Sequence, residues 1–343
     1  MKTIENPWRG QGLVDGVLAE NSGPSVDAAA PLRLLSECPA HGETPLERRE
    51  AFGTTLFVKD ERGRMGLGSF KALGAAYVIA HEAAATGAEH WAVALAERTY
   101  VTASAGNHGM SVAAGAKVFG AKAVVYIAET VPESFAGRLR DRGAEVVRAG
   151  SDYESSMKAA EQAATDNGWT LLSDSSWPGY VDLPWRLMEG YLVMAEEAVR
   201  QMPEVPTYIF LQAGVGGLAG ACAALFRAHW GAEPRIVVVE PEAAPALQAS
   251  IEAGRPVATE GPVSAMGRLD CKEPSLIALR GLSRDADAFV TLSEDEAAEV
   301  LPELKLMGLE STESGAAGLA AARLMGLGPD ARVLCILSEQ AVG

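Results

Sequence analysis

The stretch Thr207–Gly220, TYIFLQAGVGGLAG, joins a strand-like run to a helix-like run through a loop of glycines. The run YIFL at 208–211 is apolar throughout, which is typical of a strand covered on both faces of its sheet. Glycine lets the loop turn tightly and expose its N–H groups, and the start of the following helix adds a partial positive charge. We therefore expect a phosphate-binding loop here. The alternative is a tight turn in which the glycines only permit close packing.

The same alternation of strand and helix runs through most of the chain. Strands are expected at 55–59, 100–103, 121–127, 144–148, 170–173, 207–212, 235–240 and 332–337, with 91–96 as a further piece of the second strand region. Helices are expected at 71–86, 109–118, 133–141, 152–167, 186–200 and from 218 onward, whereas residues 1–50 look irregular. Strands that alternate with helices of this length predict βαβ units. The fold class is therefore α/β, with open, twisted, mostly parallel sheets flanked by helices.

The composition narrows the class of function. The 343 residues carry a formal net charge of −16, so the basic surface that nucleic-acid binding requires is missing. No apolar run is long enough to span a membrane, and the N-terminal segment lacks the apolar core of a secretory signal. Neither the four cysteines nor the five histidines have metal-ligand spacing, so we expect no metal site and read most cysteines as core residues. A cytoplasmic enzyme is the simplest interpretation.

A lone lysine interrupts another segment punctuated by glycines, GLGSFKALG at Gly66–Gly74. Lysines usually lie on solvated faces, but Lys71 stands at the start of an apolar, alanine-rich helical run. Burial lowers the pKa of an amine, and we expect this effect to let Lys71 act as a nucleophile and as a base.

A second loop with polar groups lies between a strand and a helix, in the sequence TASAGNHG at 102–109. It offers the Ser104 hydroxyl, N–H groups near Gly106 and the Asn107 amide. The helix start suits a carboxylate, and Asn107 suits a phenolic oxygen. His108 is either a ligand contact or a core residue that touches the loop.

Ser338 follows the last strand, in the sequence CILSEQ, where its hydroxyl either caps the strand or meets a ring nitrogen. The chain then offers an amine, a phosphate cradle, an amide for a ring oxygen and a hydroxyl for a ring nitrogen. Pyridoxal 5'-phosphate (PLP) needs these four groups. We therefore predict PLP as the cofactor, linked covalently to Lys71.

A competing interpretation comes from the glycine loop alone. The segment GVGGLA at 214–219 fits the relaxed G-x-G-x-x-G/A fingerprint of dinucleotide-binding folds, and Glu240 ends the next strand, where a ribose-binding acid would lie. An NAD-dependent oxidoreductase is therefore an alternative from a different class. It gives no account of Lys71.

The motifs together resemble those of the fold type II PLP-dependent enzymes, the superfamily of threonine dehydratase and the tryptophan synthase β chain. GSFK at 68–71 is similar to their SFK segment, SAGNH at 104–108 to their S-x-G-N-H loop, and AGVGG at 213–217 to their phosphate loop. Within the superfamily, the chain most resembles the diaminopropionate ammonia-lyases. The similar segments are FKALGAAY at 70–77, DSSWPGY at 174–180, FLQAGVG at 210–216 and ESTESGA at 310–316.

The resemblance implies a role for each residue. Lys71 would bind the cofactor covalently and then take the Cα proton, while Asp174 would orient the distal amino group of the substrate. A neutral hydroxyl at Ser338 would leave the pyridine nitrogen largely unprotonated, which favours elimination over transamination or racemisation. The implied cofactor-binding residues are Lys71, Asn107 (at the ring O3'), Gly214, Val215, Gly216, Gly217, Leu218 and Ser338. The implied substrate-binding residues are Ser104, Ala105, Gly106 and His108.

One residue departs from the resemblance. Where the diaminopropionate ammonia-lyases have an aspartate in a T-D-G-N-H loop, this chain has Ala105, so it lacks a second acid or base and an anionic partner for a second ammonium group. The implied reaction is α,β-elimination of a β-substituted amino acid to a 2-oxo acid and ammonia, with 2,3-diaminopropionate as the first choice of substrate. Dehydration of serine, threonine or 3-hydroxyaspartate is the alternative that Ala105 favours, and β-replacement is a third.

The resemblance also implies how the chain is organised. Residues 1–75 and 203–343 would form a large PLP-binding domain and residues 76–202 a small one, with the cofactor in the cleft between them. The proline-rich PEVP at 203–206 agrees with the second boundary. Members of the superfamily are usually homodimers, so we expect a homodimer that acts on a small amino acid, without a nucleic-acid or membrane partner.

Overall fold

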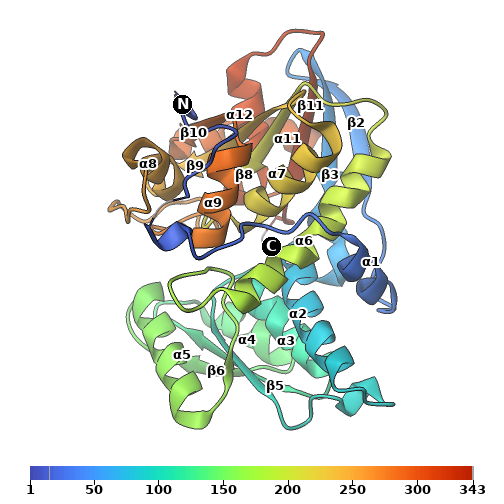
Figure 1. Ribbon diagram of the computed structural model, residues 1–343, viewed down its shortest axis with the longest axis vertical. Helices are drawn as coiled ribbons and strands as arrows, with labels where there is room; N and C mark the ends of the chain where they lie inside the picture. Colours follow the sequence, from blue (N-terminus) through green and yellow to red (C-terminus); the bar gives the residue numbers. More distant parts are fainter. Residues whose placement is uncertain (15, 342–343) are drawn as a thin grey trace.

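The computed structural model describes residues 1–14 and 16–341, which form two lobes stacked along the long axis of the molecule (Figure 1). Each lobe is built around one sheet. The strands of the larger sheet, in spatial order, are β1 (Lys2–Glu5), β10 (Ala288–Leu292), β9 (Arg235–Pro241), β8 (Tyr208–Gln212), β11 (Arg332–Leu337), β3 (Thr54–Asp60) and β2 (Leu46–Ala51). Those of the smaller sheet are β6 (Glu145–Arg148), β5 (Lys122–Ile127), β4 (Thr99–Ala103) and β7 (Thr170–Leu171).

Both sheets are mostly parallel. Only the edge strands β1 and β2 run antiparallel to their neighbours within the described chain. The connections are helical, as parallel pairing requires. The α-helices are α1 (Ala29–Ser36), α2 (Lys71–Ala85), α3 (Asn107–Val118), α4 (Glu133–Asp141), α5 (Tyr153–Asn167), α6 (Asp182–Gln201), α7 (Gly217–Trp230), α8 (Ala246–Ala253), α9 (Leu276–Asp285), α10 (Glu294–Ala298), α11 (Leu301–Leu306) and α12 (Glu313–Met325).

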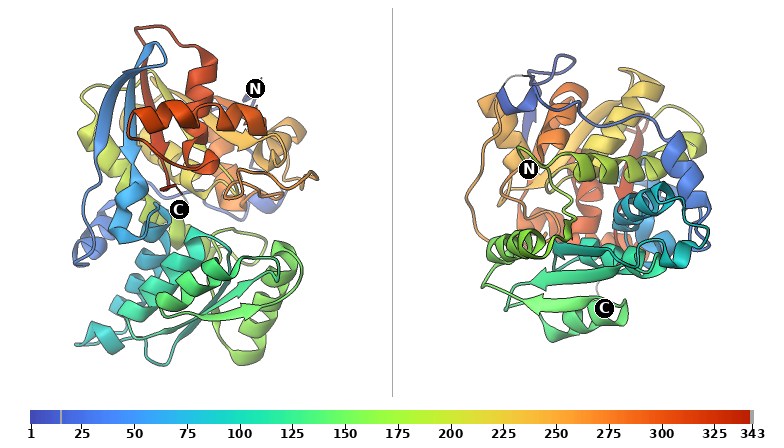
Figure 2. Two further views of the ribbon diagram at one scale, coloured as in Figure 1. Left: turned by 180° about the vertical axis from the view of Figure 1, so that it is seen from behind. Right: turned by 60° about the horizontal axis from the view of Figure 1, so that its bottom comes forward.

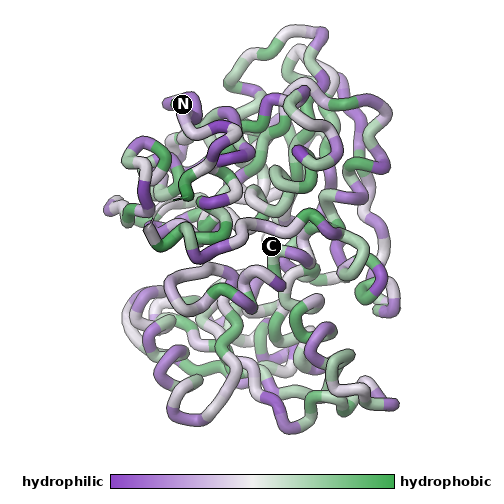
Figure 3. Tube along the Cα trace, viewed as in Figure 1, coloured by the Kyte–Doolittle hydropathy of each residue, from purple (hydrophilic) through white to green (hydrophobic). Residues whose placement is uncertain are grey.

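Helices cover both faces of each sheet, because successive side chains of a strand point to opposite sides. In the larger sheet, Ile209 and Leu211 of β8 join the core that includes α7 and α9, whereas Phe210 joins the core that includes α12. In the smaller sheet, Val101 of β4 packs in a cluster with Ala160 of α5. The tips of the outer loops are hydrophilic (Figure 3).

The helix α6 joins the two lobes. It packs against α2 on one side and α7 on the other, and its apolar residues belong to one core that extends into both lobes. Views from behind and from below show the lobes meeting at these helices (Figure 2). No helix in the described residues combines the length and apolar character needed to cross a membrane.

The structure confirms the α/β class and corrects two local predictions. The segment 91–96 is not a strand: Trp91–Val93 forms a 3-10 turn whose side chains are exposed, so it lacks the burial that its apolar residues suggested. Residues 1–50 are not wholly irregular, because they contain β1, α1 and most of β2. Both strands lie at sheet edges, where their side chains are exposed or partly exposed, which explains the absence of a continuous apolar run.

The proposed domain boundaries stay predictions. The first, at 75/76, falls within α2, and the second, at 202/203, lies just after the end of α6.

Candidate active site

Five loops meet between the lobes, and each follows the carboxyl end of a parallel strand. They come after β3, β4, β7, β8 and β11. Open α/β folds bind their ligands at this edge of the sheet. The residues predicted to bind PLP or the amino-acid substrate all lie on these loops or at the start of the next helix.

Lys71 is the first residue of α2, and its amine forms an ion pair with the carboxylate of Asp174. The two side chains are 21% and 18% exposed, so the pair lies at the boundary between core and solvent. The Phe70 ring packs against Tyr191 of α6, with 4.9 Å between the ring centroids, and the Lys71 Nζ lies 5.5 Å from the Phe70 centroid. Aromatic rings thus position an amine that has one carboxylate as its partner.

The pKa of Lys71 is raised, which corrects the expectation that burial lowers it. Burial does oppose the charged amine, but the Asp174 carboxylate stabilises the ammonium more strongly. Burial also opposes the charge of Asp174, yet the Lys71 ammonium holds the pKa of that carboxyl well below its usual range. While Lys71 has no covalent bond to a cofactor, its ammonium and the Asp174 carboxylate therefore form a charged pair at neutral pH.

In the glycine loop between β8 and α7, Gly214 and Gly216 have no room for a side chain. A Cβ at Gly214 would lie 2.9 Å from the Cys271 Sγ, and one at Gly216 would lie 2.9 Å from the Ala278 Cβ. Gly216 also has a φ of +98°, which disfavours other residues. The first N–H groups of α7, from Gly217 onward, have no partner within the helix, so the loop is a cradle for an anion.

The loop before α3 is held by its own side chains. The Ser104 Oγ accepts hydrogen bonds from the N–H groups of Gly106 (3.2 Å) and Gly109 (3.0 Å). The His108 Nε2 bonds the Leu172 carbonyl at 2.8 Å, and burial lowers the pKa of this imidazole. Ser104 and His108 therefore shape the loop, and their contact with a substrate stays a prediction. Ala105 is exposed.

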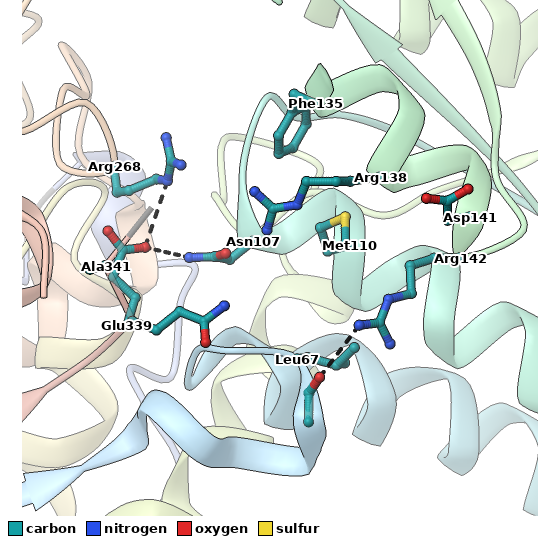
Figure 4. Close-up of a pocket in the computed structure, with 12 residues that line it drawn as sticks. Leu67, Asn107, Met110, Phe135, Arg138, Asp141, Arg142, Arg268, Glu339 and Ala341 are labelled. Atoms are coloured by element: carbon teal, nitrogen blue, oxygen red, sulfur yellow. Dashed lines mark hydrogen bonds and ion pairs between the residues drawn. The ribbon is translucent and has the colours of Figure 1, made fainter. Parts of the chain in front are cut away.

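Asn107 reaches across the cleft to the other lobe (Figure 4). Its amide nitrogen donates to the buried carboxylate of Glu339, which also accepts from the Thr312 hydroxyl. The Arg268 Nε lies 3.6 Å from the same carboxylate. Glu339 thus gathers polar groups from both lobes beside the predicted position of the ring oxygen.

Ser338 lies close to the lysine. It is buried, and its carbonyl accepts a hydrogen bond from the Phe70 N–H at 3.1 Å. The backbone of Glu339 pairs with that of Ser69. The end of β11 is therefore joined to the segment that carries Lys71.

Sequence reasoning missed four residues at this site: Tyr191, Cys271, Glu339 and Arg268. Tyr191 lies in an ordinary helical run, and Glu339 and Arg268 lie in loops, so no local pattern set them apart. Cys271 is one of four cysteines, most of which were predicted to be core residues. It lies against Gly214, and burial raises the pKa of its thiol to about 12.

The position of Glu240 does not support the NAD interpretation. Glu240 is completely buried, and its carboxylate accepts hydrogen bonds from the N–H groups of Leu247 (2.8 Å) and Gln248 (2.7 Å) at the start of α8. Burial raises its pKa to about 8. Because these contacts occupy both carboxylate oxygens inside the core, Glu240 is not placed to bind a ribose.

The residues present fit PLP. The glycine cradle suits the phosphate, the Lys71 amine suits an aldehyde, and Asn107 and Ser338 supply polar groups at the same cleft. The buried hydroxyl of Tyr191, beside Lys71, has no hydrogen-bond partner in the described part of the chain. An unpaired buried hydroxyl of this kind is stabilised by a polar ligand.

Comparison with known proteins identifies the family. The model of the family "Pyridoxal-phosphate dependent enzyme" matches residues 38–339. Diaminopropionate ammonia-lyase of Salmonella typhimurium is 32% identical over 282 residues, which cover 76% of this chain and 70% of that protein. L-threonine ammonia-lyase of Thermotoga maritima is 26% identical over 273 residues, which cover 79% of this chain and 63% of that protein.

Solved structures agree. Diaminopropionate ammonia lyase from Escherichia coli in complex with D-serine matches with a TM-score of 0.87 at 27% identity, covering 99% of this chain and 93% of that one. Another structure of that enzyme, in complex with an aminoacrylate-PLP azomethine reaction intermediate, matches over the same shares with a TM-score of 0.85. The predicted cofactor and the fold type II architecture are confirmed. This chain belongs to the pyridoxal-phosphate dependent enzymes, and it is an ammonia-lyase of that family.

Proposed function

We propose that the chain carries out α,β-elimination on a β-substituted amino acid and releases a 2-oxo acid and ammonia. The observation that supports this most is the Lys71–Asp174 pair, because it holds one amine beside one carboxylate at the cleft. When bound, PLP supplies an electron sink for the electron pair left at Cα.

In this proposal each residue of the site has its own role. Lys71 binds the cofactor through its amine and, once released, takes the Cα proton and holds it. Asp174 orients that amine. The glycine loop and the start of α7, Gly214–Leu218, hold the phosphate, and Asn107 and Ser338 hold the ring. The start of α3 binds the substrate carboxylate through its N–H groups.

For the substrate, we propose 2,3-diaminopropionate first, because the relatives that are 32% identical over most of this chain are diaminopropionate ammonia-lyases by name. Asp174 is then the partner of the distal amino group. The exposed methyl of Ala105 supports a second class, the β-hydroxy amino acids serine, threonine and 3-hydroxyaspartate, because it offers no carboxylate to a second ammonium. In β-replacement, the third possibility, a nucleophile takes the place of the β-substituent, and no hydrolysis to a 2-oxo acid follows.

The proposal includes the organisation of the chain. We place the cofactor between a large domain of residues 1–75 and 203–343 and a small domain of residues 76–202. We also propose a homodimer in the cytoplasm, on the resemblance to the superfamily alone.

A panel of β-substituted amino acids of both hands tests the function, with 2-oxo acid and ammonia as the measured products. The purified holoenzyme should have a visible absorption band that borohydride removes and that Lys71→Ala lacks. A protein that stays colourless with added PLP, or that releases no ammonia from any member of the panel, would overturn the proposal.

A further inference from the structure

The pocket at the mouth of the cleft is locally positive in an acidic protein. It has a volume of about 450 Å³ and is lined from both lobes. Three arginines line it, Arg138, Arg142 and Arg268, against two carboxylates, Asp141 and Glu339. The whole chain has a net charge of −16, so the sign is reversed here. A local reversal of this kind attracts an anion.

Arg268 lies directly over the loop that begins α3. Its Cδ and Nε would be 3.3 and 3.4 Å from a Cβ at Gly106, the N-cap of that helix. The Nε faces Glu339, but this carboxylate already accepts hydrogen bonds from Asn107 and Thr312. The terminal nitrogens of Arg268 have no hydrogen-bond partner among the residues that the structure describes, so they can bind a ligand.

Arg138 faces the same pocket from the other lobe, with its guanidinium pointing toward Asn107 (Figure 4). Its guanidinium carbon lies 5.8 Å from the centroid of Phe135 on its own helix. Within the described residues, 1–14 and 16–341, the Arg138 side chain forms no ion pair or hydrogen bond. Arg142, by contrast, donates to the Gly66 carbonyl at 3.4 Å. Arg138 and Arg268 are therefore the two arginines of the pocket whose guanidinium groups form no hydrogen bond with the described residues.

We propose that Arg268 and Arg138 form a carboxylate-binding site that recognises the amino-acid substrate, with one arginine from each lobe. The inference rests on the proposed function, since a substrate at the start of α3 has its carboxylate beside Gly106 and Arg268. A guanidinium binds a carboxylate through two parallel hydrogen bonds. Because the arginines belong to different lobes, a carboxylate bound by both also holds the lobes together.

Ala105 agrees with this assignment. Its exposed methyl leaves the loop without a carboxylate that would compete for the arginines. The bound group is either the α-carboxylate that every substrate has or a second carboxylate on the β-substituent. These two sources share one chemistry, and ligands that carry one or two carboxylates distinguish them.

The test uses amino acids that bind without eliminating. L-Alanine has no leaving group, and L-alaninamide differs from it only in lacking the carboxylate charge. Dissociation constants are measured from the change in the visible spectrum of the holoenzyme. In Arg268→Gln we expect L-alanine to bind about 10- to 100-fold more weakly and L-alaninamide to bind as in the wild type. Arg268→Lys should recover part of the loss, because it restores the charge.

Arg138→Gln identifies which carboxylate Arg138 binds. If it binds a second carboxylate, only L-aspartate loses affinity, whereas L-alanine is also affected if it binds the α-carboxylate. The matched control is Arg140→Gln on the same helix, which pairs with Glu133 and does not line the pocket. This variant should bind L-alanine and L-aspartate as the wild type does. Unchanged affinity for both in Arg138→Gln would remove Arg138 from the site.

A loss for L-aspartate alone in Arg268→Gln would assign Arg268 to a second carboxylate. Equal losses for L-alanine and L-alaninamide, or no loss for L-alanine, L-alaninamide and L-aspartate alike, would refute the proposal. The melting temperature and the cofactor band of each variant should match the wild type, which separates ligand binding from folding. Failure of the proposed function looks different, since the wild type would then release no ammonia from any amino acid.

Discussion

Two lysines near one segment of chain, Lys59 in β3 and Lys71 in α2, are used in opposite ways. Lys59 is completely buried, and its ammonium contacts the Glu197 carboxylate (2.7 Å), the Thr44 carbonyl (2.6 Å) and the Gln201 amide oxygen (2.9 Å). Lys71 is partly exposed and pairs with Asp174 alone in the described part of the chain. The first ammonium has no donor left over, whereas the second can exchange its partner for a ligand.

The groups around Lys59 and Lys71 differ in the same way. Beside Lys59, the buried guanidinium of Arg64 donates to both Glu61 and Glu197, so that cations and carboxylates satisfy one another. Burial lowers the pKa of Lys59 despite these carboxylates, while Asp174 raises that of Lys71. A completely paired buried charge anchors the fold. A charge with a single partner beside a pocket remains available for chemistry.

Removal of the Lys71 amine should have the largest effect. In Lys71→Ala we expect elimination to fall about 10⁴-fold, because the chain loses both its covalent link to the cofactor and its base. The melting temperature of the apo protein should change little, since the side chain is partly exposed. Steady-state ammonia release and a thermal melt measure the two effects. Residual turnover within tenfold of the wild type would contradict the role of this lysine.

Breaking the buried network of Lys59, Arg64 and Glu197 should lower the stability of the protein and leave its activity unchanged. Glu197→Gln leaves Arg64 and Lys59 without their shared carboxylate, and we expect the free energy of unfolding to fall by about 3–5 kcal/mol. Denaturant titration measures it. The control is Glu196→Gln in the same helix, whose partner His229 is at 2.9 Å and partly exposed, with an expected loss of less than about 1 kcal/mol. Similar losses in both variants would show that burial of the pair does not matter.

Lys59→Met should have a smaller effect. Methionine fills the space of the lysine stem, and Glu197 keeps Arg64 as its partner. The Thr44 carbonyl and the Gln201 amide oxygen lose a donor, so we expect a loss of about 1–3 kcal/mol in the free energy of unfolding. Turnover per folded molecule should stay within about twofold, since this lysine is outside the cleft. If turnover fell as in Lys71→Ala, the distinction between the two lysines would be wrong.

The smallest effect concerns pH and the apo protein. Asp174 has a lowered pKa when folded, so its contribution to stability is present above its unfolded pKa of about 4 and is lost as the pH falls. Lys71 has a raised pKa, so its contribution is present below about pH 10 and is lost as the pH rises further. Asp174→Asn should therefore lower the unfolding free energy by about 1 kcal/mol or less between pH 5 and 9 (roughly), and the difference should shrink outside that window. An equal difference at about pH 3 would contradict the ion pair.

Sequence patterns singled out the loops that meet at the cleft, but not the contacts around them. Lys71, Asn107 and the Gly214 loop were singled out because lysine, amide and glycine residues in short loops between strand and helix form local patterns, and their binding roles stay predictions. Tyr191 and Glu339 were not found, because a buried tyrosine in a helix has the same pattern as any core residue. The pKa of Lys71 was predicted in the wrong direction for the same reason. Burial is visible in an apolar run, but the approach of Asp174 depends on tertiary structure.

The order of strands in the larger sheet has a consequence for synthesis of the protein. β3 pairs early with β2, but it joins the rest of the sheet only through β11, the last strand to leave the ribosome. The smaller sheet has all its strands by residue 171. We therefore expect a nascent chain with a folded small lobe, in which Lys71 waits for Ser338. Capture of the cofactor is then a late event, and a chain cut before β11 has the reactive lysine without the site that controls it.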